Sequence, residues 1–163
     1  MQGLFQLQDA QGLLAKLRHD FGRLKADHVD VCAAFDFFVT ARHLPEWLYP
    51  GDKTKQAALF DGSVLLRVCR HIADGSKHFQ ATSKQHDSVN STALEGSVFQ
   101  PGVFQSNAFQ VGTMVVYLDG DAAITLGESI EVTDLARRVL DYWEAHPDLK
   151  QRRANTHRTS AST

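Results

Sequence analysis

The stretch that decides the fold spans residues 29–48 and reads VDVCAAFDFFVTARHLPEWL. Its apolar side chains cover most of the circumference of a helix, which is the pattern of a helix buried on several sides. A single line of polar side chains interrupts this surface, because Asp36, Thr40 and His43 recur at i, i+4 and i+7. Pro45 removes a backbone donor, so we expect a bend or a new turn there. The pattern predicts the central helix of the fold.

Helical patterns also lie on both sides of this segment. At about 9–26, leucines recur at helical spacing behind a capping aspartate. A third helical pattern covers residues 57–79 and contains a possible break at 61–63, where a new cap is available. A fourth begins near residues 129–133 and ends near 146. The sequence therefore predicts a mostly α fold, a four-helix up-and-down-type bundle.

The segment between the third and fourth helices has a different pattern. Residues 80–96 are mostly polar and predict an exposed loop. Between residues 109 and 118, one set of side chains (Phe109, Val111, Thr113, Val115 and Tyr117) alternates with a second set that contains Met114, Val116 and Leu118. Asp-Gly-Asp separates this run from residues 122–126, which predicts a small antiparallel β-hairpin. A short third strand is expected within 98–104. We place this β insertion at about 96–126.

Length and composition narrow the class of protein. A chain of 163 residues with 43% hydrophobic residues suits one domain, which we place at 1–147, followed by a disordered basic tail at 148–163. The formal net charge of -2 provides no global field for nucleic acid. Cys32 and Cys69 lie in apolar helical patterns, so we expect buried reduced thiols and not a disulfide framework. No run approaches the roughly 18 apolar residues of a membrane span. We expect a cytoplasmic protein without a membrane partner.

The third helical pattern holds the main candidate site. At 3.6 residues per turn, Arg67, His71, Asp74 and His78 line one face, with Arg70 beside them. A solvated helix face usually alternates lysine and glutamate, whereas this one gathers histidine, arginine and aspartate. Burying the polar line of the central helix without partners would cost several kcal/mol. We therefore expect the two polar lines to face each other across a shared crevice.

Such a cluster supports several chemistries. In a metal-independent ribonuclease, His78 or His71 would remove a 2′-hydroxyl proton while Arg70 binds the phosphate. In a metal site, His43, His71, Asp74 and His78 would supply the ligands that zinc or iron accepts. A structural network of ion pairs without chemistry is the third interpretation. In a different class, the chain would be a non-catalytic interaction module whose apolar strands or helix faces bind a cognate protein or a second copy.

Two segments, residues 34–44 and 69–79, resemble those of small uncharacterised bacterial proteins. More distantly, the helical layout with a basic third helix that ends in histidine resembles the HEPN superfamily of helical-bundle proteins. That resemblance implies an RNA-binding protein or a metal-independent ribonuclease of the toxin or defence type, with RNA as partner and no cofactor. It places Arg70 and His78 in the catalytic roles, with His71, Asp74 and Arg67 in support.

Overall fold

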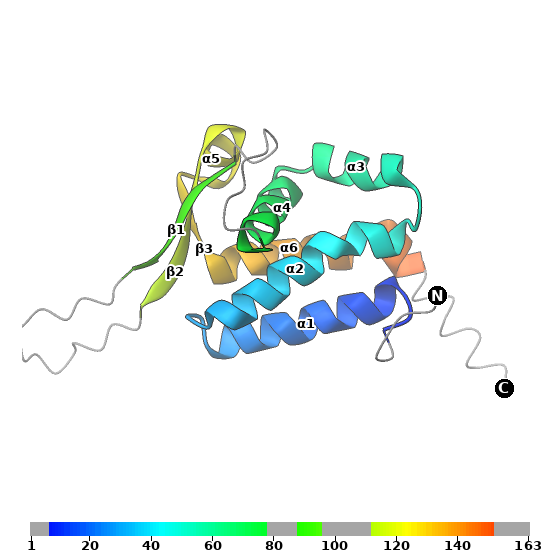
Figure 1. Cartoon of the computed structure of the whole chain (residues 1–163), viewed down its shortest axis with the longest axis horizontal. Coiled ribbons are helices and arrows are strands. Elements are labelled where there is room, and N and C mark those ends of the chain that lie inside the picture. Colours follow the sequence, from blue (N-terminus) through cyan, green and yellow to red (C-terminus); the bar gives the residue numbers. More distant parts are fainter. Residues whose placement is uncertain (1–6, 78–87, 96–111, 152–163) are drawn as a thin grey trace, which may run out of the picture.

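A computed structural model of the chain describes residues 7–77, 88–95 and 112–151 (Figure 1). The elements follow in the order α1 (Ala10–Ala26), α2 (Val31–Leu48), α3 (Lys53–Asp61), α4 (Val64–Lys77), β1 (Val89–Glu95), β2 (Thr113–Leu118), α5 (Gly120–Leu126), β3 (Ser129–Glu131) and α6 (Val132–Ala145). A further helical turn covers residues 147–151.

Helices α1 and α2 lie side by side and run in opposite directions (Figure 1). Each begins at an aspartate that caps the first turn: Asp9 accepts a hydrogen bond from the Gly12 amide, and Asp30 accepts one from the Ala33 amide. Helix α2 continues through Pro45 to its end. The predicted first and second helices are therefore confirmed.

A three-stranded antiparallel sheet in the order β1-β2-β3 lies at one end of the helices (Figure 1). Strand β2 is central, with Leu94 paired to Met114 on one side and Ile130 paired to Val116 on the other. Helix α4 contacts β1, and α6 contacts both β2 and β3. The sheet thus extends the helical core instead of forming a separate layer.

The core is one continuous apolar cluster contributed by all the long helices and by the sheet. Trp143 on α6 and Phe37 and Phe38 on α2 are among its largest fully buried side chains. The ring of Phe38 lies edge-on to that of Phe37, with 5.3 Å between the ring centroids. Burial of α2 on several sides, as its composition predicts, is confirmed.

The predicted fold class is confirmed in outline, but the number and arrangement of the helices differ from the prediction. The fold is mostly helical with a small antiparallel sheet, and α6 matches the predicted last helix. The third helical pattern forms two helices, α3 and α4, that separate at the predicted break. The described residues therefore confirm a mostly helical fold with a small antiparallel sheet, and they do not confirm the four-helix up-and-down-type bundle.

The predicted β-hairpin needs three corrections. Residues 122–126 belong to helix α5 and not to a strand. The prediction was wrong here because a short apolar run suits either a strand or a helix. Residues 89–95, expected as a loop, form β1, whose polar side chains suit an exposed edge strand. Residues 129–131, expected at the start of the last helix, form β3. The predicted strand within 98–104 lies outside the described residues.

The predicted tail is described only at its start. Residues 147–151 are helical and Leu149 is buried, so the disordered tail does not begin at 148. Residues 152–163 lie outside the described part.

Candidate functional site

Arg67 on α4 connects three helices. Its Nη1 donates to the Asp61 carbonyl oxygen at 3.1 Å and to the Phe60 carbonyl oxygen at 3.5 Å, at the C-terminal end of α3. Its Nη2 forms an ion pair with Asp121 on α5. Carbonyls at a helix C-terminus lack partners within the helix, so the guanidinium satisfies them. This geometry gives Arg67 a structural role.

His71 is buried at the junction of α4 and β1. Its Nδ1 accepts a hydrogen bond from the Val89 amide at 3.0 Å and lies 3.3 Å from the Ser88 hydroxyl. A ring nitrogen that accepts from an amide carries no proton, so His71 has its proton on Nε2 when it is neutral. The Nδ1 atom is thus engaged in holding the start of β1.

Arg42 and Arg70 both contact the ring of Phe60, and we call these three residues the arginine–phenylalanine cluster. The guanidinium carbons lie 5.3 Å and 4.8 Å from the ring centroid, for Arg42 and Arg70 respectively. Arg42 also forms ion pairs with Glu46 at 3.3 Å and with Asp74 at 3.4 Å. Asp74 of the predicted site therefore connects α4 to α2 through Arg42.

Arg70 differs from its neighbours in its partners. Within the described residues its guanidinium forms no hydrogen bond and no ion pair, and its Nε is buried. Burial lowers the pKa of Arg70 from its usual value, and the positive charge of Arg42 lowers it further. Arg70 is thus a half-buried cation whose contact in the described structure is an aromatic ring.

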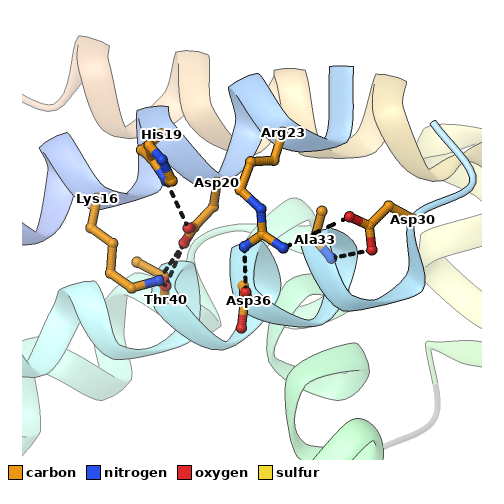
Figure 2. Close-up of polar contacts among 8 residues, drawn as sticks. All are labelled: Lys16, His19, Asp20, Arg23, Asp30, Ala33, Asp36 and Thr40. Atoms are coloured by element: carbon orange, nitrogen blue, oxygen red, sulfur yellow. Dashed lines mark hydrogen bonds and ion pairs between the residues drawn. The ribbon is translucent and has the colours of Figure 1, made fainter. Parts of the chain in front are cut away.

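The polar line of α2 mostly faces α1 (Figure 2). Asp36 pairs with Arg23 at 2.6 Å, and the Thr40 hydroxyl donates to the Asp20 carboxylate at 2.9 Å. His43, further along the line, lies 3.1 Å from Glu46 on its own helix.

The expectation that Asp36 and Thr40 face the polar line of α4 is therefore wrong. Periodicity identifies the side of a helix that needs polar partners, but it does not identify the neighbouring helix that supplies them. The partners of these two side chains come from α1.

The predicted metal site receives no support from the described residues. Across residues 7–77, 88–95 and 112–151, no three His, Cys, Asp or Glu side chains lie together in a group that could hold a metal ion. His78, which belongs to both the metal set and the catalytic pair, lies outside the described residues.

An apolar groove that was not predicted opens between α2, α4 and the sheet. It has a volume of about 410 Å³ and a mostly apolar lining, and three of its side chains are well exposed: Val31 at 69%, Phe35 at 39% and Leu94 at 55%. Met114 of β2 and Ile72 of α4 also line it. The sequence signal was weak, because these residues come from segments far apart in the chain.

Comparison with known protein families, curated proteins and solved structures finds no match to this chain. Separately, none of the helices in the described ranges combines the length and the apolar character needed to cross a membrane.

Proposed function

We propose that this protein is a non-catalytic interaction module that associates with a second copy of itself through the apolar groove and strand β1. The observation that carries the proposal is the position of the groove directly beside the edge of the sheet. Thr92 and Leu94 of β1 line the groove, and β1 is one of the two edge strands of the described sheet.

Edge strands present backbone donors and acceptors that another strand can pair with. Residues 90–95 of β1 are exposed along their whole length, and the strand contains no proline and no lysine that would guard it. An antiparallel pair of identical strands is related by a two-fold axis, so the same surface serves both copies. The β1 edge is thus suited to self-pairing.

Self-pairing at this edge would also cover the groove. A two-fold axis perpendicular to the sheet keeps the helices of both copies on the same side, so each groove lies next to the other. The exposed Val31, Phe35 and Leu94 side chains would then lose contact with water, which is favourable by about 25 cal/mol per Å² of apolar surface. The proposal therefore accounts for apolar exposure that a monomer leaves unexplained.

The same geometry favours binding over catalysis. Arg67 and His71, which the sequence assigned to a ribonuclease site, are engaged with α3, α5 and β1. The ribonuclease hypothesis stays a prediction, because its second catalytic residue, His78, lies outside the described residues.

The test compares two leucine-sized apolar positions by sedimentation velocity over a concentration series up to about 100 µM, a hundredfold above a micromolar Kd. Leu94→Asp places a charge in the groove beside the β1 edge. Ile124→Asp is the matched control, because Ile124 is 88% exposed on α5 and does not line the groove. We expect the wild type and the Ile124 variant to dimerise and the Leu94 variant to stay monomeric.

Two results would contradict this proposal. One is a wild-type protein that stays monomeric over the whole series. The other is a dimer that both substitutions leave unchanged, since the contact would then lie elsewhere. Circular dichroism of each variant separates loss of association from loss of folding.

A further inference from the structure

We infer that the arginine–phenylalanine cluster of Arg42, Arg70 and Phe60 is a binding site for an oxyanion of the phosphate class. The inference does not rest on the proposed self-association, because these residues do not line the groove. It rests on the placement of two guanidinium groups against one aromatic ring, one of them without a counterion among the described residues.

The geometry keeps Arg70 in place without neutralising it. Its guanidinium carbon lies 4.8 Å from the centre of the Phe60 ring, whose own side chain is buried and fixed at the end of α3. Cation–π contacts of this kind orient a guanidinium but leave its N–H donors available at the edge. In the described part of the chain, none of those donors has a hydrogen-bond partner.

The charges nearby leave room for an anion at Arg70. Glu46 and Asp74 both pair with Arg42, and Asp121 pairs with Arg67. Asp74 and Asp61 act on Arg70 through their charge, yet neither forms an ion pair with it. A half-buried cation that is repelled by Arg42 is unfavourable without a counterion, and a bound oxyanion would relieve both effects.

The chemistry of the donors selects the ligand class. A guanidinium binds carboxylate and phosphate through two parallel N–H···O bonds, and Arg42 adds a second positive charge on the same ring. A phosphate carries more charge than a carboxylate at neutral pH, so the charge-assisted bonds that Arg70 can donate favour phosphate. Acetate is accordingly the weaker comparison ligand.

The experiment titrates inorganic phosphate into the folded chain and follows the arginine Nε–Hε resonances by NMR, with sodium chloride at equal ionic strength as reference. We expect the Arg70 resonance to move with phosphate and not with chloride. Arg70→Gln should weaken phosphate binding about tenfold or more, because it removes charge-assisted hydrogen bonds. Arg70→Lys should recover part of the affinity. Arg138→Gln is the matched control, because Arg138 lies on α6 and pairs with Asp134.

A second arm with a short single-stranded RNA identifies the source of the phosphate group. Tighter binding that depends on Arg70 would assign the site to a nucleic-acid backbone, and no gain over inorganic phosphate would assign it to a free phosphate or a small ester. The inference is overturned if chloride moves the Arg70 resonance as phosphate does. It is also overturned if Arg70→Gln binds phosphate as tightly as the wild type and the Arg138→Gln control do. The wild-type titration keeps the test decisive even if an Arg70 variant fails to fold.

Discussion

Substitution of Thr40 by valine tests the polar contact that joins α1 to α2 (Figure 2). The buried Thr40 hydroxyl accepts a hydrogen bond from Lys16 Nζ at 2.8 Å and donates one to Asp20 Oδ2 at 2.9 Å. Valine has nearly the same shape, so the change removes these two bonds and leaves little cavity. Asp20 is buried and cannot replace the lost donor with bulk water.

The magnitude follows from what remains after the change. A hydrogen bond to a charged group contributes about 1.5–3 kcal/mol. Lys16 still pairs with Asp20 at 2.5 Å and is partly exposed, so the loss of the hydrogen bond from Lys16 to Thr40 costs little. We therefore expect the loss of one charged hydrogen bond to lower the free energy of unfolding by about 2 kcal/mol. In a chain of this size that loss lowers Tm by roughly 4–8 °C.

Urea and thermal unfolding followed by circular dichroism measure this difference. Thr54→Val is the matched control, because Thr54 is exposed on α3 and should change stability by less than about 0.5 kcal/mol. If the two variants unfold at the same urea concentration, the Lys16–Asp20–Thr40 contact does not stabilise the helix pair and the reasoning fails.

Three further predictions concern titration, thiol reactivity and RNA. Burial lowers the pKa of His146, so as the pH falls the unfolded chain binds a proton before the folded chain does. The contribution of His146 to the free energy of unfolding is therefore present above about pH 6.5 and is lost as the pH falls. His146→Gln should reduce this loss in unfolding measured from about pH 7.5 to about pH 5.5. Burial raises the pKa of the Cys69 thiol to about 12, so Ellman's reagent at pH 8 should label Cys32 in the folded chain and both thiols only after unfolding; rapid labelling of both would contradict this. A non-catalytic module leaves total RNA intact in EDTA, whereas cleavage that His78→Ala abolishes would restore the ribonuclease hypothesis.

The helices that the sequence predicted well are those with a local signal. Helix α1 carries a capping aspartate and a regular apolar side, and α6 carries a strong apolar side that buries Trp143. Both signals depend on residues three or four positions apart, so they can be read without knowing the neighbours. Their confirmation follows from that locality.

The parts that were missed depend on contacts between distant segments. Strand β1 has a polar sequence, and only its pairing with β2 makes it a strand. The short run at 122–126 is apolar enough for a strand, but it forms a helix that buries Ala122 and exposes Ile124. The groove likewise joins α2, α4 and the sheet, and no single window of sequence contains it.

The polar face of α4 shows how one pattern can be interpreted in two ways. Arg67 binds α3 and α5, His71 binds the start of β1, and Asp74 pairs with Arg42 of α2. Each of these side chains therefore holds a different neighbour, so these contacts are one interpretation of the unusual mixture of histidine, arginine and aspartate, and the untested ribonuclease site is the other. Arg70 is the contrasting member, because in the described structure it has an aromatic contact and no anion. Loss of Arg67 or His71 should thus lower stability, whereas loss of Arg70 should first lower anion binding.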